Sequence, residues 1–241
     1  MHAPQRVTVS GAKLTYGGGP LLTAVEVFTV FWGQAWQDAG SVALVGGLND
    51  FYTTILSSPM IERLAEYSVP GAAIGHGRLI GTTTVADVPI GARVSENDVV
   101  AMLQKKITAG TLPKNGANTL YCVYLPSGVV ATLGSDSSCG AAGGSGFCGY
   151  HDATADGLYY AIMAYPDCAG CKAGGSGLSV LESLTEVSSH ELCEAITDPV
   201  PGKGWYDRAN GEIGDICNWQ YHTIDGYTVQ VEWSNQRNVC G

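Results

Sequence analysis

The chain has 241 residues, a formal net charge of −10 and a sequence pI near 4.8. Hydrophobic residues make up 45% of it, which is enough to bury a sizeable core and excludes a disordered chain. Only 14% of the residues are charged, and lysine and arginine are not clustered. This composition argues against nucleic acid or an anionic membrane surface as a partner, and no stretch is apolar for long enough to insert into a membrane.

The cysteines indicate disulfides. An even number of them in a glycine-rich chain of low charge is typical of proteins from an oxidising compartment. We expect the local pairs Cys139–Cys148, Cys168–Cys171 and Cys217–Cys240, although spacing alone leaves the connectivity open. The single Cys168-Ala-Gly-Cys171 motif lacks the second knuckle of a zinc ribbon. It also lies in a loop, where a thioredoxin-like redox role is not expected.

The secreted location that the cysteines predict has a consequence for the N-terminus. Met1-His-Ala-Pro-Gln-Arg6 contains no apolar leader sequence. We therefore expect the chain to be the mature form of a secreted protein, with its signal peptide removed and Met1 added for expression.

In chain order, residues 1–20 are expected to form an extended segment that ends in the turn Gly17–Pro20, and residues 21–241 a single domain. Runs of β-branched and aromatic residues predict the strands 24–32, 78–88, 119–125, 159–165 and 227–233. Apolar residues at helical spacing predict helices over 48–69 (one helix capped by Asn49, or two short ones), 95–110 and 180–197. A disulfide is expected to tie the Gly/Ser-rich loop 134–149. The fold class is therefore α/β (α+β), a mixed sheet with flanking helices.

The last of these helices carries the most informative motif. Ser179 and Glu182 form a capping box at its start, and Asp198-Pro199 ends it. Within it, His190-Glu191-Leu192-Cys193-Glu194 is an HExxE sequence, which is expected by chance only about 0.01 times in a chain of this composition.

Two ligands four residues apart lie on one face of a helix, one turn apart. His190 and Glu194 are therefore candidate zinc ligands, and Glu191 is the candidate general base that takes a proton from water. The alternative is a solvated helix face bearing acidic residues.

A catalytic zinc needs a third protein ligand, and the following loop offers two. Glu212 lies 18 residues after Glu194, close to the spacing of the third ligand in thermolysin-like enzymes. Asp215 could orient His190 or bind the metal itself. Both could equally be acidic residues that close a turn. His151 is a further candidate, either as a ligand or as a catalytic donor to a developing oxyanion.

Other residues carry weaker signals. Tyr206 and Tyr227 could donate to an oxyanion, whereas His76 and His222 are expected to be surface or core residues. Cys193 points away from the His190/Glu194 face and is expected to be a buried thiol or a disulfide partner. No Gly-x-Ser-x-Gly sequence is present, which excludes the usual serine hydrolase elbow.

Several segments together resemble the EXORDIUM (phosphate-induced protein 1) family, in particular its microbial branch. The resemblance extends from Tyr16 to Gly241 and rests on the following segments: Tyr16-Gly-Gly-Gly-Pro20, Val-Phe-Trp-Gly33, Cys148-Gly-Tyr-His151, Cys168-Ala-Gly-Cys171, Ser189-His-Glu-Leu-x-Glu194 and Glu212-Ile-Gly-Asp-Ile-Cys217. It implies an extracellular protein whose candidate residues form one site, but the family has no well-defined biochemical activity. Cys193 departs from the small apolar residue expected inside the motif.

The function predicted from these residues is a secreted zinc metallopeptidase with a zincin-like architecture, acting on a peptide or protein substrate. Zn²⁺ is the expected cofactor, with Ca²⁺ as an additional or alternative ion. A glutamate-rich ligand set acidifies bound water less than three histidines do, so activity is expected at neutral or higher pH. The alternatives are a non-catalytic extracellular or cell-wall binding protein with a structural metal, and a metal-dependent hydrolase of another substrate class.

Overall fold

The computed structural model describes residues 11–138, 140, 146–167, 171 and 177–241. Its largest sheet has five strands in the order β3-β2-β5-β9-β8. The first four of these strands are parallel, and β8 pairs antiparallel to β9 at one edge. The five strands are β2 (Glu26–Trp32), β3 (Arg78–Val85), β5 (Thr119–Tyr124), β8 (Gly149–Ala153) and β9 (Tyr159–Met163).

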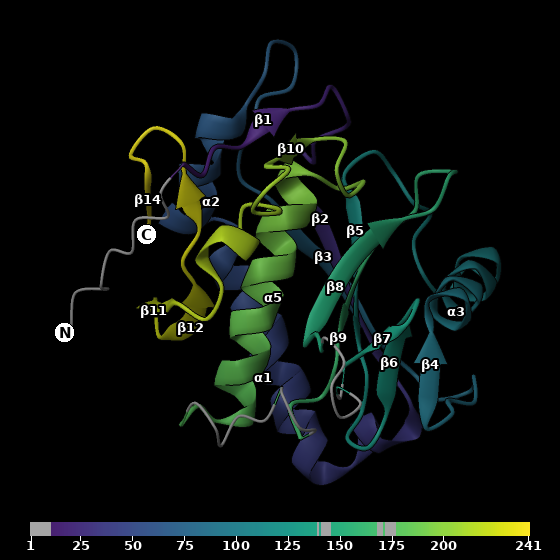
Figure 1. Cartoon of the computed structure of the whole chain (residues 1–241). Coiled ribbons are helices and arrows are strands. Elements are labelled where there is room, and N and C mark those ends of the chain that lie inside the picture. The colour runs from purple at the N-terminus through teal and green to yellow at the C-terminus, as the bar shows by residue number, and fades with distance from the viewer. Residues whose placement is uncertain (1–10, 139, 141–145, 168–170, 172–176) are drawn as a thin grey trace.

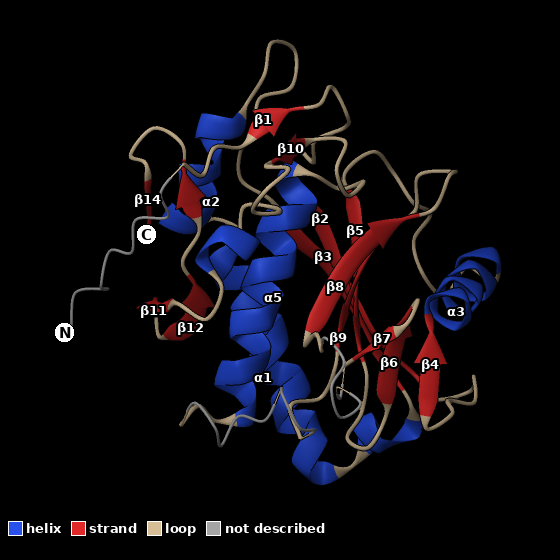
Figure 2. Ribbon diagram, viewed as in Figure 1, coloured by secondary structure: helices blue, strands red, loops and turns tan. Residues whose placement is uncertain are grey.

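Helices cover both faces of this sheet (Figures 1 and 2). Four α-helices lie in the described part of the chain: α1 (Ala39–Ile55), α2 (Pro59–Arg63), α3 (Glu96–Thr108) and α5 (Val180–Thr197). Val27 and Phe31 of β2 pack in one core with α1 and α5, whereas Phe28 and Val30 pack in a second core with α3. Both faces of β2 are buried, which explains why its sequence is apolar at every position from 27 to 32 except the buried Thr29, instead of alternating.

The remaining elements are small and lie around the large sheet. A three-stranded sheet β4-β6-β7 packs beside α3, and three antiparallel pairs are β1–β10, β11–β12 and β13–β14. Their bounds are β1 (Thr15–Tyr16), β4 (Arg93–Ser95), β6 (Val130–Leu133), β7 (Asp136–Ser137), β10 (Trp205–Tyr206), β11 (Tyr221–Ile224), β12 (Tyr227–Gln230), β13 (Trp233–Ser234) and β14 (Val239–Cys240). Short 3₁₀ turns are η1 (Gln34–Gln37), η2 (Leu64–Tyr67) and η3 (Asp215–Cys217). The division of the chain at residue 20 stays a prediction.

The mixed α/β fold agrees with the sequence prediction, but the start of the first helix, α1, differs from it. The helix predicted from residue 48 begins at Ala39, and Asn49 does not cap it. The Asn49 side chain instead accepts a hydrogen bond from Thr29 (2.6 Å) and donates one to Thr82 (3.2 Å), linking α1 to the sheet. The first turns of α1 contain Gly40, Gly46 and Gly47 and are mostly exposed, so they carry no apolar periodicity.

The strand predicted over 227–233 is also divided in the structure. Its first part is β12, and Trp233 belongs to β13, which pairs with β14. β8 was not predicted at all, because its sequence, Gly-Tyr-His-Asp-Ala, has little β-branched character.

Two disulfides are described, and one of them corrects the predicted pairing. Cys148 is bonded to Cys171, so the predicted pairs Cys139–Cys148 and Cys168–Cys171 are wrong. The reason is the antiparallel pairing of β8 with β9, which brings the start of one strand to the end of the other. Cys148 therefore lies beside the segment that follows β9. Cys139 and Cys168 lie outside the described residues.

The second disulfide, Cys217–Cys240, confirms the predicted pair. It closes a loop with a sequence separation of 23 residues and joins the end of η3 to β14. Disulfides of this kind are typical of proteins from oxidising compartments. None of the helices in the described segments is long and apolar enough to cross a membrane.

Removing Cys217–Cys240 by a double substitution to serine is expected to lower the free energy of unfolding by about 3 kcal/mol, because the open loop gains entropy in the unfolded chain. Guanidinium chloride unfolding without reductant measures this change. Substituting the buried free thiol Cys122 with alanine is the matched control for the loss of a sulfur atom alone. An unchanged unfolding midpoint in the double variant would contradict a stabilising role for the bond.

Candidate metal centre

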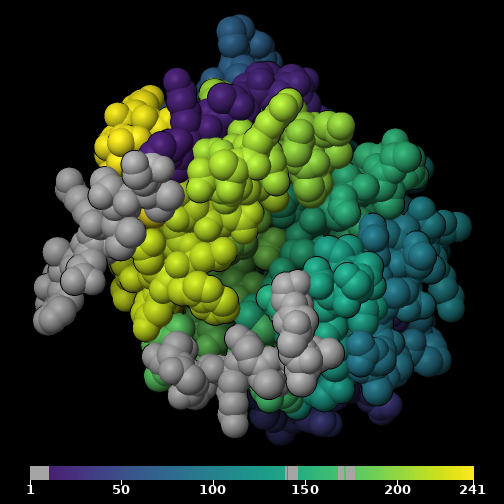
Figure 3. Space-filling view, in the orientation of Figure 1, coloured from purple at the N-terminus to yellow at the C-terminus, as the bar shows by residue number. Residues whose placement is uncertain are grey.

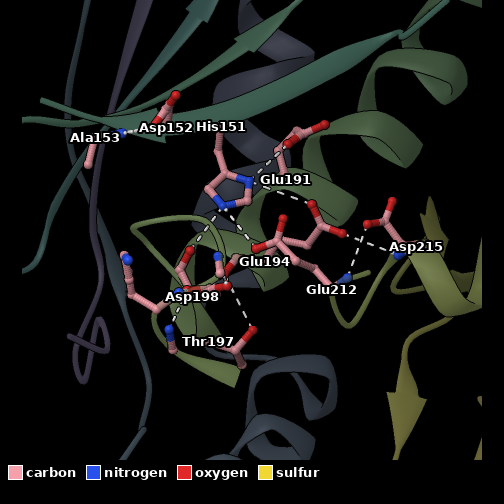
Figure 4. Close-up of polar contacts among 12 residues, drawn as sticks. His151, Asp152, Ala153, Glu191, Glu194, Thr197, Asp198, Glu212 and Asp215 are labelled. Carbon is pink, nitrogen blue, oxygen red and sulfur yellow. Dashed lines mark hydrogen bonds and ion pairs between the residues drawn. The ribbon is translucent and has the colours of Figure 1, made fainter. Parts of the chain in front are cut away.

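The helix α5 supplies three of the candidate residues. Its start is the predicted capping box, in which Ser179 accepts from the Glu182 backbone and the Glu182 carboxylate accepts from the Ser179 backbone. Leu184, Leu192 and Ile196 anchor the helix in the core against the sheet. This anchoring directs the HExxE residues toward β8 and toward the loop that follows β10 (Figure 4).

β8 supplies His151, which lies among the carboxylates of α5. Its Nδ1 atom is 3.3 Å from Glu191 Oε2 and 3.5 Å from Glu194 Oε2. Its Nε2 atom is 3.1 Å from the backbone oxygen of Asp198 and 3.4 Å from Glu212 Oε1. The side chains of His151, Glu191 and Glu194 are each no more than 5% exposed. These three residues form a buried group that could hold a metal ion.

A second group shares Glu194 with the first. His190 Nε2 lies 3.2 Å from Glu194 Oε1, one helical turn away, and the Asp215 backbone N–H donates to the same oxygen at 3.2 Å. His190, Glu194 and Asp215 each offer a ligand atom, and these atoms lie within 4.8 Å of one another. The Asp215 carboxylate also accepts from the Glu212 backbone (3.0 Å), which holds the loop in place. The inner group is therefore His151–Glu191–Glu194, and the outer group is His190–Glu194–Asp215.

The nitrogen–oxygen distances in both groups are compatible with metal ligation. Charge-assisted N–H···O⁻ hydrogen bonds are usually about 2.7–2.9 Å long. The nitrogen–oxygen distances here are 3.2 to 3.5 Å. Two ligands on a tetrahedral zinc, each bonded at about 2.0–2.1 Å, lie about 3.3–3.4 Å apart. The three histidine–glutamate distances are close to this separation, and the other ligand atoms of each group lie within 4.8 Å of one another.

The site is strongly acidic. No lysine or arginine of the described residues forms an ion pair with its carboxylates; the only positive partners are His151 and His190. Burial raises the pKa of Glu191, and burial together with the Glu194 charge raises the pKa of Glu212 to about 8. Burying this many carboxylates without a cation is costly.

The same acidic surroundings shift the pKa values of the two histidines. Burial alone would lower the pKa of His151, but contacts with the surrounding glutamates outweigh burial and raise it well above the usual value. The pKa of His190 is raised in the same way, chiefly by Glu194. Glu194 lies between both rings, and they lower its pKa although burial acts in the opposite direction. A bound cation would compete with protons for these atoms.

A pocket of about 190 Å³ opens beside the outer group. In the space-filling view, green atoms of α5 lie in a hollow between the teal β7–β8 region and the yellow C-terminal segment (Figure 3). The walls include His190, Glu191 and Asp215, together with the apolar side chains of Phe147 and Trp219. The pocket therefore gives access to His190 and Asp215 of the outer group and to Glu191.

The glycines of the surrounding loops make room for the site. A Cβ atom at Gly214 would lie 2.6 Å from His190 Nδ1, and one at Gly149 would lie 2.7 Å from Glu191 Oε1. Real Cβ atoms essentially never make contacts this short, so a side chain at either position would have to displace His190 or Glu191.

Gly214→Ala is expected to displace the His190 ring and to weaken binding of a divalent ion roughly 10–100-fold, the usual effect of disturbing a ligand's support. Zinc titration of the purified protein by calorimetry measures this change. Gly46→Ala in α1 is the control, because its Cβ would meet nothing within 4 Å. Equal affinities in the Gly214→Ala and control variants would contradict the assignment of His190 to the metal centre.

The structure brings all six predicted site residues together, although it does not test their roles. His190 and Asp215 belong to the outer group and Glu191 and His151 to the inner group; Glu194 is shared, and Glu212 contacts His151. Burial and then the charge of Glu212 raise the pKa of Tyr206. Tyr227 packs against Phe51 in the core. Cys193 is a buried free thiol, as predicted.

Other residues of the site were missed. Glu186 is buried and lines the pocket one helical turn before His190, so helical periodicity could have identified it. Asp198, read only as the end of the helix, offers its backbone oxygen to His151, and its carboxylate accepts three backbone N–H groups of residues 202–204. Trp219 and Gln230 also line the pocket, and nothing in their sequence context indicated it.

Comparisons of the chain with protein-family models, curated proteins and solved structures give no match. The resemblance to the EXORDIUM family therefore stays a prediction.

Proposed function

We propose that the protein is a secreted metal-dependent hydrolase that cleaves peptide bonds, with one Zn²⁺ held by the outer group and Glu191 as general base. The observation that carries this proposal is the position of the outer group. Its ligand atoms lie within 4.8 Å of one another at the wall of a pocket that Glu191 also lines. A hydrolytic metal needs such an open position beside a base.

Glu191 is suited to take a proton from a water molecule in the pocket. Its Oε2 atom contacts His151, and its Oε1 atom lies close to Gly149 at the pocket wall. Burial raises the pKa of Glu191, which brings it closer to the range in which a carboxylate accepts a proton effectively near neutral pH. A divalent ion bound nearby would supply Lewis-acid polarisation of the substrate carbonyl and of the water.

The ligand types favour zinc over calcium. Each group contains an imidazole nitrogen, and Zn²⁺ accepts mixed nitrogen and oxygen ligands. Ca²⁺ binds six to eight oxygen atoms and does not favour imidazole. Calcium therefore remains the less favoured ion.

The position of β8 supports an extended peptide as the substrate. β8 is an edge strand of the five-stranded sheet, and its first residue, Gly149, lines the pocket. A peptide can add to such an edge through main-chain hydrogen bonds and so present its own backbone to the site. The mixed sheet with an edge strand and the HExxE helix is also the basis on which we propose a zincin-like architecture.

Trp219 is the residue we expect to bind an apolar side chain of the substrate. It lines the pocket, is 70% exposed and has a backbone φ of 66°, a conformation that is uncommon for a bulky residue. Trp219→Ala is expected to lower kcat/KM for substrates with an aromatic side chain about tenfold, since aromatic contacts contribute about 1 kcal/mol or more.

Tyr221→Ala is the matched control for Trp219→Ala, because Tyr221 is an exposed aromatic residue two positions further on and does not line the pocket. Steady-state kinetics on a series of peptides measures both variants. An equal loss for aromatic and small side chains would contradict the proposed role of Trp219.

The inner group supports one alternative. His151, Glu191 and Glu194 are buried, and a closed site of this kind is typical of a structural metal in a non-catalytic extracellular protein. The two disulfides are compatible with an extracellular location in either case.

A digestion experiment separates the two functions. A mixture of peptides is incubated with the protein as purified, after removal of metal with a chelator, and after reloading with Zn²⁺. The proposal predicts cleavage that is lost on stripping and restored by zinc. A protein that binds zinc but cleaves nothing would support the structural-metal alternative, and cleavage that persists without metal would contradict the proposal.

A further inference from the structure

We infer that the centre holds two divalent cations, one in each group, with the Glu194 carboxylate bridging them. This inference rests on the proposed outer ion and adds a second, inner ion that is ligated by His151, Glu191 and Glu194. The inner group comes from β8 and α5, the outer group comes from α5 and the loop that carries Asp215, and Glu194 of α5 belongs to both; Figure 4 shows Glu194 between His151 and Asp215.

The two oxygens of Glu194 face different histidines. Oε1 lies 3.2 Å from His190 Nε2 and accepts from the Asp215 backbone, whereas Oε2 lies 3.5 Å from His151 Nδ1. Each oxygen of Glu194 therefore belongs to a different ligand set, as is required of a carboxylate that bridges two ions.

The tautomer of His151 gives a second reason for the inner ion. Its Nε2 lies 3.1 Å from the Asp198 backbone oxygen, which can only accept a hydrogen bond, so Nε2 carries a proton. In the neutral ring, the lone pair of Nδ1 then faces Glu191 Oε2 and Glu194 Oε2. These three electron-rich atoms repel one another unless a cation, or a second proton on the ring, lies among them. Histidine ligands in metal sites are commonly held this way, with the other ring nitrogen donating to a carbonyl.

Glu212 completes the surroundings of the inner group. Its Oε1 atom is buried, has no hydrogen-bond partner among the described residues, and lies 3.4 Å from His151 Nε2. An ion in the inner group would therefore be surrounded by the carboxylates of Glu191, Glu194 and Glu212 and by the His151 ring.

The two ions would differ in access. The outer group faces the pocket, and Asp215 is exposed. The inner group is enclosed by β8 and α5, with side chains no more than 5% exposed. We therefore expect a chelator to remove the outer ion quickly and the inner ion slowly. The inner ion would hold Glu191 by Oε2 and leave Oε1 directed to the pocket side.

The test is a Mn²⁺ titration of the full chain after complete removal of metal, with metal analysis and electron paramagnetic resonance. Two Mn²⁺ per chain with an exchange-coupled spectrum are expected for the wild type, which requires no variant that might misfold. His151→Ala and His190→Ala should each retain one Mn²⁺ and show an uncoupled spectrum. His76→Ala is the control, because His76 forms an exposed pair with Glu62 at a similar distance of 3.4 Å.

The outcomes separate this inference from the proposed function. One Mn²⁺ in the wild type that is lost in His190→Ala and kept in His151→Ala would overturn the inner ion and leave the outer ion standing. One Mn²⁺ that is lost only in His151→Ala would overturn the outer ion and the bridging role of Glu194. No bound Mn²⁺ and no bound Zn²⁺ would overturn both.

Discussion

Replacing Glu191 with glutamine is expected to lower kcat/KM for peptide hydrolysis about 10²–10⁴-fold, the usual contribution of a general base. The amide keeps the shape of the side chain and one oxygen that can contact an ion, but it cannot accept the proton from water. Of the two glutamates in the HExxE motif, only Glu191 lines the pocket, and Gly149, which lies against its carboxylate, lines the pocket too. Single-turnover assays with a fluorogenic peptide measure the chemical step directly.

The control for Glu191→Gln is Glu62→Gln. Glu62 pairs with His76 outside the pocket. The side chain of Glu62 is 61% exposed and that of His76 is 51% exposed. Zinc content measured on the same samples separates loss of the base from loss of the metal. A Glu191→Gln variant that retains zinc and full activity would contradict the role of Glu191 as base.

Removal of metal is expected to lower the melting temperature by roughly 8–16 °C at pH 8. An ion present at about 1,000 times its dissociation constant stabilises the folded chain by about 4 kcal/mol. Each kcal/mol shifts the melting temperature of a chain of this size by roughly 2–4 °C. Calorimetric scans with zinc and with a chelator measure the difference.

The pH dependence of this difference follows from the shifted groups. The pKa of His151 and of His190 is raised in the metal-free fold, so their stabilising protonation is complete below about pH 6.5 and is lost as the pH rises through the raised values. The pKa of Glu212 is raised to about 8. The stability that its protonation gives the folded, metal-free chain is therefore complete below about pH 4.3 and is lost as the pH rises toward 8.

As the pH rises from 5 to 8, the titration of His151, His190 and Glu212 therefore lowers the stability of the metal-free protein. Over the same range ions bind more tightly, because protons compete less for the ligand atoms. The difference in melting temperature should widen over this range. A metal-free protein that becomes more stable from pH 5 to pH 8, or a difference that narrows, would contradict the assignment of these groups to one metal centre.

The local features of the active helix were predictable from sequence. The capping box of Ser179 and Glu182 and the stop at Asp198-Pro199 depend on neighbouring residues, and the structure places α5 between them. The spacing of His190 and Glu194 is likewise a property of one helix, so their side-by-side placement followed from the helical period. Glu212 and Asp215 were identified because they follow the motif in a short acidic loop.

Features that depend on strand order were not predictable in the same way. His151 reaches the centre because β8 joins the sheet antiparallel to β9, and a short strand that begins with glycine carries no strong strand signal. The same pairing determines the Cys148–Cys171 bond, which local spacing misassigned. Trp219 lies at the pocket because the Cys217–Cys240 bond and η3 hold its loop, and both are tertiary features.

The central claim is that a divalent ion occupies the outer group, and an anomalous difference map at the zinc edge tests it most directly. Crystals of the full chain grown with Zn²⁺ are expected to show a strong peak in contact with His190 Nε2, Glu194 Oε1 and the Asp215 carboxylate. Crystals in which the outer group carries no anomalous peak, with the His190 ring hydrogen-bonded directly to Glu194, would contradict it.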